Sequence, residues 1–296
     1  RDRYKAGTHE VINIDACQIE DELSGAIIRD IRGLLHSFKI KTYDEDTGYG
    51  LLRHVLVRRG FHSGEVMVVL VLGSPVLPSK NHFVMALREL HPEISTVIVN
   101  VNDKRTSMVL GDKESVIYGK GYIEDTLCGC TFRISPKSFY QVNPVQTKKL
   151  YGTALAYADL QGKETVWDLY CGIGTISLFL AQKAKAVYGV EIVPQAIEDA
   201  RKNAVLNNME NATFFVGKAE EVLPDWYAKH SQEESEMAHP DVIVVDPPRK
   251  GCDEKCLDTM LKMQPDRIVY VSCDSATLAR DLRILVDGGY TLQKVR

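Results

Sequence analysis

Apolar runs in the second half of the sequence end in residues that are able to do chemistry. Cys273 follows the run IVYVS, Asp246 follows VIVV, and Glu191 follows YGV. A thiolate is a nucleophile, and a carboxylate accepts hydrogen bonds or offsets a positive charge. On this pattern Cys273 has two interpretations: the last residue of a core strand, or a thiol placed at the end of a strand to attack a substrate.

A glycine loop precedes these residues in the chain. The strand-like run VWDLY (166–170) leads into CGIGT (171–175), where two glycines let the backbone turn tightly and approach a ligand. Glu191, at the tip of the next strand, is placed to accept hydrogen bonds from ribose hydroxyls. This arrangement fits a dinucleotide or S-adenosylmethionine. Ser177 replaces the third glycine of the dinucleotide pattern, which favours adenosylmethionine because that ligand has no phosphate to cradle.

Alternating strands and helices are predicted to position these residues. The predicted strands are 165–170, 186–192, 212–217, 241–246 and 267–273. Strands separated by helices predict parallel βαβ units and a doubly wound sheet, in which ligands bind beyond the carboxyl ends of the strands. Because neighbouring strands lie about 5 Å apart, Cys273 is expected to reach the region of Asp246 and the ligand. The acidic segment 227–240 is predicted to be a surface loop.

A smaller mixed α/β domain is predicted before this sheet. Apolar spacing indicates a helix over 20–38, and the runs 51–59 and 65–73, separated by GFHSG, indicate a hairpin. A further helix is expected at 81–91, and further strand-like runs lie at 96–103 and 126–135, with Cys128 and Cys130 in a hairpin. We divide the chain into residues 1–125 and residues 126–296, and a long helix entered through Asn143-Pro144 opens the second part.

Composition limits the functional classes. The 296 residues are 45% hydrophobic and 26% charged, with a formal net charge of −4, which is typical of a soluble two-domain protein. A nucleic-acid partner would need a local basic patch. No apolar run approaches the roughly 20 residues of a membrane helix, and no secretory signal is visible. Seven cysteines in a chain of this size indicate a reducing cytoplasm rather than a disulfide framework, and we expect a monomer.

A thiol beside a methyl donor favours one kind of chemistry. Carbon 5 of a pyrimidine is a poor nucleophile, but addition of a thiolate to carbon 6 gives an enolate-like intermediate whose carbon 5 attacks a methyl group. A base must then remove the carbon 5 proton. A helix beginning near Ser275 is expected to favour the thiolate anion of Cys273. Arg249 follows Asp246-Pro247-Pro248 where amine methyltransferases carry a stacking aromatic residue, so amine methylation is disfavoured.

Five segments together resemble the RNA uracil-5 methyltransferase family: SPKSFYQVNP, DLYCGIGTISL, YGVEI, DPPRKG and VYVSCDSATLARDL. The resemblance covers essentially the whole chain. It implies a Rossmann-like class I adenosylmethionine-dependent methyltransferase domain with incomplete C-terminal strands, and methylation of carbon 5 of a uridine in RNA. Cys273 would be the nucleophile and Asp246 a positioning residue. The implied adenosylmethionine contacts are Gln141, Tyr170, Gly172, Gly174, Thr175, Glu191 and Asp246. RNA cytosine-5 methyltransferases carry a second cysteine where this sequence has Pro248, so uracil is favoured.

The sequence departs from the family pattern at both ends. The family's catalytic base is a glutamate in a His-Val-Glu-like segment, and this sequence stops at LQKVR before it; an N-terminal RNA-binding TRAM domain is also missing. We therefore expect a fragment that is inactive without that base. Many ribosomal-RNA members bind an iron–sulfur cluster through four cysteines, and Cys17 resembles the fourth. One cysteine cannot hold a cluster, so no metal site is predicted here; Cys17 is a remnant ligand or an ordinary cysteine. We interpret four further cysteines as structural rather than metal-binding: Cys128, Cys130, Cys252 and Cys256.

RNA is the predicted partner, and 23S ribosomal RNA is favoured over transfer RNA by the large N-terminal domain and the context of Cys17. The candidate RNA contacts are Arg53, His54, Arg58, Arg59, His62, Lys137, Lys148 and Lys149. Phe139 and Tyr140 are candidates for stacking on the flipped base. The alternatives are a methyltransferase for an amine or small molecule with a structural Cys273, a nicotinamide-dependent oxidoreductase, and an RNA-binding module without activity.

Overall fold

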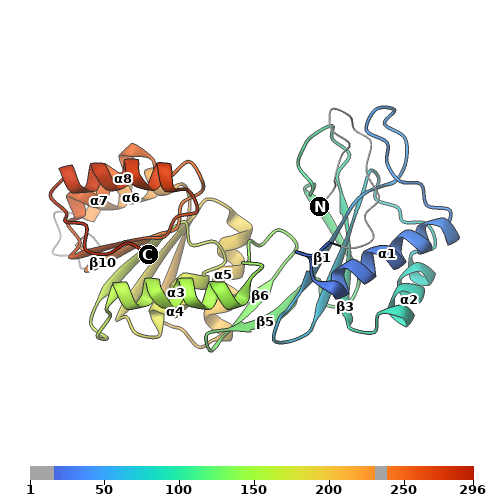
Figure 1. Cartoon of the computed structure of the whole chain (residues 1–296), viewed down its shortest axis with the longest axis horizontal. Helices are drawn as coiled ribbons and strands as arrows, with labels where there is room; N and C mark the ends of the chain where they lie inside the picture. Colours follow the sequence, from blue (N-terminus) through green and yellow to red (C-terminus); the bar gives the residue numbers. More distant parts are fainter. Residues whose placement is uncertain (1–16, 231–238) are drawn as a thin grey trace. The chain divides into compact units, whose positions relative to one another are not determined.

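The computed structural model describes residues 17–230 and 239–296, and the chain divides into two compact units (Figure 1). The first unit runs to Thr126 and includes Ile134–Pro136; the second contains Leu127–Arg133 and Lys137–Arg296. Strands β5 (Ile123–Leu127) and β6 (Cys130–Ile134) form a two-stranded sheet. The hairpin predicted around Cys128 and Cys130 is confirmed: Cys128 and Gly129 adopt left-handed backbone conformations and turn the chain back on itself, so the strand-like run 126–135 is divided between two strands.

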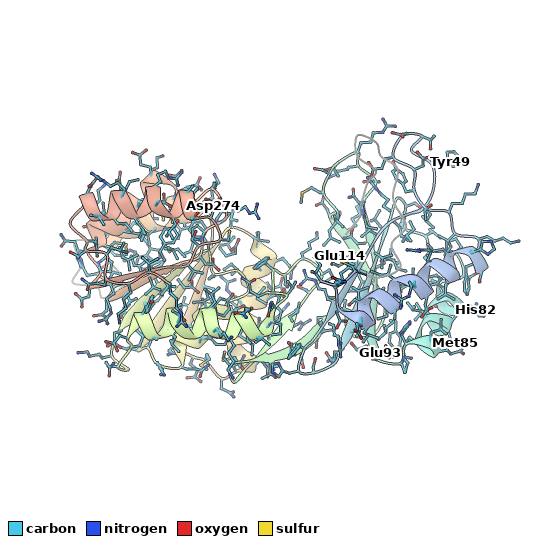
Figure 2. All side chains as sticks on the ribbon, viewed as in Figure 1. Tyr49, His82, Met85, Glu93, Glu114 and Asp274 are labelled. Carbon is cyan, nitrogen blue, oxygen red and sulfur yellow. The ribbon has the colours of Figure 1, made fainter. Side chains whose placement is uncertain are left out.

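The first unit contains a four-stranded sheet with the order β1-β2-β3-β4. Its elements are α1 (Glu22–Ser37), β1 (Leu52–Arg59), β2 (Val66–Leu72), α2 (Lys80–Leu90), β3 (Ile94–Val101) and β4 (Lys113–Tyr118). The predicted β1–β2 hairpin is confirmed by antiparallel pairing, and both predicted helices are present. The core of this unit lies between the two helices and the sheet, with Ile31, Phe83 and Leu70 fully buried. His82 and Met85 lie on the exposed side of α2 (Figure 2).

Strand β4 was not predicted. It pairs antiparallel with β3 at the edge of the sheet, and most of its residues are exposed. The first four residues of KESVIY are exposed and the last two are partly buried. Its sequence therefore lacks the apolar alternation that identifies a half-buried strand.

The second unit contains a five-stranded parallel sheet with the order β11-β10-β7-β8-β9. Its elements are α3 (Pro144–Ala158), β7 (Thr165–Leu169), α4 (Thr175–Ala181), β8 (Ala186–Glu191), α5 (Pro194–Leu206), β9 (Ala212–Val216), α6 (Ala219–His230), β10 (Val242–Val245), α7 (Glu254–Met263), β11 (Arg267–Tyr270) and α8 (Ser275–Asp287). Helices α6, α7 and α8 cover one face of the sheet, and α3, α4 and α5 cover the other (Figure 1). The strand order reverses between β7 and β10, which is where such sheets bind ligands.

Helix α6 corrects the prediction of a surface loop over 227–240. The helix continues to His230, and residues 231–238 lie outside the described part of the chain. Ala219 and Leu223 are buried one turn apart, and Trp226 packs against the same core. Pro224 is in the second turn, where its missing N–H removes one helical hydrogen bond and its ring crowds the carbonyl four residues earlier. In the parts of the chain described above, no helix has the length and apolar content to cross a membrane.

Candidate active site

The carboxyl ends of the central strands form the candidate active site. Val245 of β10 pairs with both Leu169 of β7 and Tyr270 of β11. Leu169 in turn pairs with Val190 of β8. The residues that follow these four therefore lie at one level, at the same edge of the sheet. This register brings the glycine loop, Glu191 and Asp246 to one edge.

The glycine loop after β7 has an unusual backbone. Tyr170, Gly172 and Gly174 have φ values of 66°, 56° and 81°, so alternate residues are left-handed. A side chain at Gly174 would press on the ring of Phe214 at 3.1 Å, whereas one at Gly172 would meet open space. Gly174 is thus required by close packing, and Gly172 leaves room beside the loop.

Glu191 is held in place by backbone donors. Gly172 N donates to its Oε2 at 3.2 Å, and Val193 N donates to its Oε1 at 2.9 Å. The carboxylate keeps further lone pairs for other donors, because each ionised oxygen accepts about two hydrogen bonds. Thr175, the first residue of α4, is almost completely buried beneath this loop.

Asp168 is a functional candidate that the sequence reasoning used only as context for the loop. It lies inside β7 with 0% of its surface exposed. Ser177 Oγ donates to its Oδ2, and Oδ1 has no hydrogen-bond partner among the described residues. Burial raises the pKa of Asp168 to about 7, against the partly compensating hydrogen bond from Ser177. The signal in the sequence was a charged residue inside an otherwise apolar strand.

Asp246 lies directly after β10, and its N–H donates to Leu169 O at 3.3 Å. Burial raises the pKa of Asp246 to about 6. Tyr151 of α3, a residue that the sequence reasoning missed, is buried close enough for the charge of Asp246 to act on it, and its phenol hydrogen-bonds Gln141. The pKa of Tyr151 is raised, chiefly by burial. Tyr151 therefore connects Gln141 to the part of the sheet edge that holds Asp246.

The side chain of Tyr170 lies elsewhere. Its ring packs against the core cluster that contains Cys256 and Leu257. The pKa of its phenol is raised by burial and by the neighbouring Cys256 and Cys252 thiols. The ring of Tyr170 is therefore partly buried against the core that contains α7, and its predicted contact with adenosylmethionine stays a prediction.

Cys273 lies in the turn between β11 and α8. The predicted strand was too long: β11 ends at Tyr270, and the Ser272 hydroxyl accepts from Asp274 N at 3.1 Å as the chain turns. All seven cysteines lie in the described ranges, and Cys273 alone among them is classed as exposed. A buried strand-end cysteine would show the opposite, so the structure favours an accessible thiol.

The N-terminus of α8 is capped by Asp274, which Figure 2 labels. Its carboxylate accepts from Ala276 N at 3.0 Å and from Thr277 N at 3.1 Å. The positive end of the helix is therefore neutralised by the carboxylate adjacent to Cys273. The first free N–H groups of α8 are thus bound to Asp274, and the influence of this helix end on the Cys273 thiolate stays a prediction.

The predicted RNA contacts differ in accessibility. Arg53 is wrong as an RNA contact: its side chain is 1% exposed, donates to the carbonyl groups of Asn102 and Lys104, and pairs with Glu45. The guanidinium of Arg58 is partly buried, which lowers its pKa, and Arg59 pairs with Asp21 at 2.7 Å. The exposed candidates of the second unit are Lys137, Lys148, Lys149 and Phe139.

The remaining cysteines show no metal site. Cys130 is buried and accepts from Gln182 Nε2 at 2.9 Å, and Cys252 and Cys256 lie in the core. Within residues 17–230 and 239–296, no group of three or more potential metal ligands occurs. Cys17 is the first residue that the structure describes. The residues before it, which belong to the segment that resembles an iron–sulfur ligand site, lie outside the described residues.

Comparison with known proteins identifies the family. The family described as tRNA (uracil-5-)-methyltransferase matches residues 64–294. The chain belongs to this family. Proteins called "uncharacterized RNA methyltransferase" in Bacillus cereus and Clostridium acetobutylicum are 51% and 46% identical over 99% of the chain. The chain spans 62% of the length of each of these relatives.

A solved structure confirms the predicted fold of this chain. It is the tRNA (uracil-54, C5)-methyltransferase of Pyrococcus abyssi in complex with S-adenosyl-L-homocysteine. The two proteins are 27% identical, with a TM-score of 0.77 over 93% of this chain and 64% of the other. The Rossmann-like methyltransferase fold, preceded by a mixed α/β sheet, is thereby confirmed, as is the family.

Proposed function

We propose that the protein transfers a methyl group from S-adenosylmethionine to carbon 5 of a uridine in RNA. The observation that carries this proposal is the placement of Cys273: an exposed thiol in the turn after β11, next to the strand that ends in Asp246. A methyl donor alone needs no thiol, whereas carbon 5 of a pyrimidine does. Family membership and the sheet edge described above support the same activity.

The residues of this edge fit the proposed donor. Adenosylmethionine carries positive charge on its sulfonium and ammonium groups, and Asp168 Oδ1 is a buried acceptor without a partner among the described residues. Gly172 leaves open space beside the loop, and Glu191 retains acceptor capacity for ribose hydroxyls. Asp246 and Gln141 complete the set that we assign to donor binding. The solved relative from Pyrococcus abyssi carries the corresponding product, S-adenosyl-L-homocysteine.

Cys273 begins the proposed reaction as the nucleophile. Its thiolate adds to carbon 6, forming an S–C6 bond and moving the C5=C6 π electrons onto carbon 5 and the carbon 4 carbonyl. Adenosylmethionine supplies the electrophilic methyl group for carbon 5. A base then takes the carbon 5 proton, the C5=C6 double bond re-forms, and the S–C6 bond breaks to release the thiolate. Asp246, at the tip of the adjacent strand, has the position to hold reacting groups in place.

We propose 23S ribosomal RNA as the substrate, on the size of the first α/β unit and the sequence around Cys17. Transfer RNA is the second candidate, because the matching family and the solved relative are both named for it. The complete protein should be incubated with labelled adenosylmethionine and either RNA, followed by nuclease digestion and mass spectrometry. We expect 5-methyluridine in 23S ribosomal RNA. Product in transfer RNA alone would overturn the ribosomal assignment, and methylation at another atom would overturn the proposed reaction.

Lysines at the start of α3 give a prediction about RNA affinity. Lys148 and Lys149 are exposed, and the described residues provide no ion pair for either. If both lysines contact phosphates, replacing them by alanine weakens RNA binding. The slope of log K against log salt concentration should then decrease in magnitude by roughly 1 to 2. Filter binding at several salt concentrations measures this slope. As a control, Lys218→Ala removes a lysine that already pairs with Glu221 at 2.8 Å and should leave the slope unchanged. An unaltered slope in the double variant would remove these lysines from the RNA interface.

A further inference from the structure

The loop after β10 is bound to the first two turns of α8 by a set of polar contacts, which has the buried side chain of Asp281 at its centre. We define this loop as residues 246–252; it begins with Asp246, and α8 begins two residues after Cys273. We propose that Asp281 is a positioning residue that sets the thiol of Cys273 relative to the Asp246 edge. This inference rests on the proposed function and adds a role for the ARDL part of the sequence VYVSCDSATLARDL.

Asp281 is the centre of these contacts. It is a charged residue with 0% exposure. Its Oδ2 accepts from Cys252 N at 2.8 Å and from the Tyr270 hydroxyl at 2.6 Å. Its Oδ1 accepts from Arg280 Nε at 2.8 Å. One carboxylate therefore joins the end of the loop, the last residue of β11 and α8 itself.

Neighbouring residues on α8 hold the rest of the loop. Arg280 donates to Lys250 O at 2.9 Å, and the Thr277 hydroxyl donates to Arg249 O at 3.0 Å. Thr277, Arg280 and Asp281 are three and four residues apart, so they share one side of the helix. Arg249, Lys250 and Cys252 of the loop are thus bound to one side of α8.

Gly251 shows how closely the loop and helix approach. Its φ is +77°, and a Cβ atom there would lie 2.6 Å from both Arg280 Nη2 and Asp281 Oδ2. The loop therefore follows the helix with glycine at the point of closest contact. Because packed polar networks of this kind have discrete arrangements, loss of Asp281 should displace the loop relative to the turn that carries Cys273.

A displacement of this kind would affect the chemical step more than donor binding. The donor-binding candidates Asp168, Gly172 and Glu191 lie on β7, β8 and the loop between β7 and α4, outside the contacts made by Asp281. Asp246 belongs to the displaced loop, but it stands at the opposite end from Cys252, where its N–H is bound to Leu169 O of β7 at 3.3 Å. The attack of Cys273 on carbon 6 requires the thiol and the uracil ring to meet in a narrow geometry. A misplacement of about 1 Å costs on the order of 10²-fold in rate. A role limited to fold stability would not separate the two steps.

The test is Asp281→Asn in the complete protein. Asparagine keeps the size but offers one acceptor oxygen, so either Arg280 or the Cys252–Tyr270 pair loses its acceptor. We expect the rate of covalent adduct formation with 5-fluorouridine-containing RNA to fall 30- to 100-fold, in line with the cost of misplacement. The Kd for adenosylmethionine should stay within about twofold, measured well below the melting temperature. Asp287→Asn is the matched control: Asp287 pairs with Arg283 at 2.8 Å on the exposed side of the same helix.

Gly251→Ala tests the same contact from the loop and covers the case in which Asp281→Asn does not fold. Its control is Gly129→Ala, where φ is +81° and a Cβ atom meets nothing within 4 Å. We expect slow adduct formation with unchanged donor Kd for Gly251→Ala only. If the unmodified protein forms an adduct and both folded variants match its rate, Asp281 is not a positioning residue. If the unmodified protein forms no adduct, the proposed function itself fails.

Discussion

Cys273→Ala is expected to lower kcat on the order of 10⁴-fold or more, since removal of a covalent nucleophile abolishes the path on which the other groups act. Without the thiol, carbon 5 of the uracil stays a poor nucleophile however well the methyl donor is bound. The Kd for adenosylmethionine should be unchanged, because the residues assigned to the donor lie on other strands. Methyl transfer to RNA and calorimetric titration with adenosylmethionine measure the two quantities separately.

The same variant should form no covalent adduct with 5-fluorouridine-containing RNA, whereas the unmodified protein should. Cys128→Ala is the matched control, because Cys128 is the partly exposed thiol in the β5–β6 turn and keeps its backbone conformation with alanine. Methyl transfer by Cys273→Ala at a rate close to that of the unmodified protein would exclude the thiol mechanism. It would favour a methyltransferase that acts on a different atom.

Asp168→Asn is expected to weaken adenosylmethionine binding on the order of 10²-fold. Loss of one partner from a buried charge pair costs about 2–5 kcal/mol, and 1.4 kcal/mol corresponds to tenfold in Kd. The affinity of the unmodified protein should rise with pH through about 7, because Asp168 must ionise to pair with the cationic ligand. The variant should lose this rise. Titrations between pH 5.5 and 8.5 measure both effects.

The stability of the ligand-free protein should change in the opposite direction. The pKa of Asp168 in the folded protein, about 7, lies above its ordinary value of 3.8, so the folded state keeps a proton that the unfolded chain has lost. The free energy of unfolding therefore falls as the pH rises from about 4 through 7, by an amount on the order of 2–4 kcal/mol. Asp168→Asn removes this loss. The free energy of unfolding of the ligand-free variant, relative to that of the unmodified protein at the same pH, should therefore be larger at pH 8 than at pH 5.

Glu164→Gln is the control for both measurements. Glu164 is a buried carboxylate at the other end of the same strand, where its Oε2 accepts from Gln161 N at 2.8 Å. Backbone hydrogen bonds lower the pKa of Glu164 despite its burial, so its contribution to stability is lost as the pH falls. Donor affinity should be unaffected. An Asp168→Asn variant that binds adenosylmethionine as tightly as the unmodified protein would remove Asp168 from the donor site.

The strand ends were predictable because each combines an apolar run with a change of residue type. Glu191 is the last residue of β8 and Asp246 directly follows β10, and the parallel register then requires them to share one edge. Cys273 was predicted as the last residue of its strand, whereas β11 ends at Tyr270 and Cys273 lies in the turn that follows. Local sequence carries this information because the core selects apolar residues along the strand and stops selecting them at its end.

The role of Asp281 was not predictable in the same way. The pattern ATLARDL identifies a helix, but the partners of Asp281 are Cys252 and Tyr270, which are 29 and 11 residues away in the chain. Arg53 shows the converse error: an arginine on a strand was interpreted as exposed, and its guanidinium instead binds carbonyl groups some 50 residues away. Such long-range polar contacts leave no periodic signal in the sequence.

The exposure pattern of the cysteines has a practical consequence. Cys130, Cys171, Cys252 and Cys256 are buried, and Cys17 and Cys128 are partly exposed. Among the described residues, a maleimide dye should therefore attach preferentially at Cys273, and replacing Cys17 and Cys128 by serine would leave Cys273 as the one exposed or partly exposed thiol of this set. The dye would report occupancy of the turn between β11 and α8 directly, since an RNA that reaches this turn would shield the thiol from labelling. The same thiol would also make the protein sensitive to oxidants at this one position.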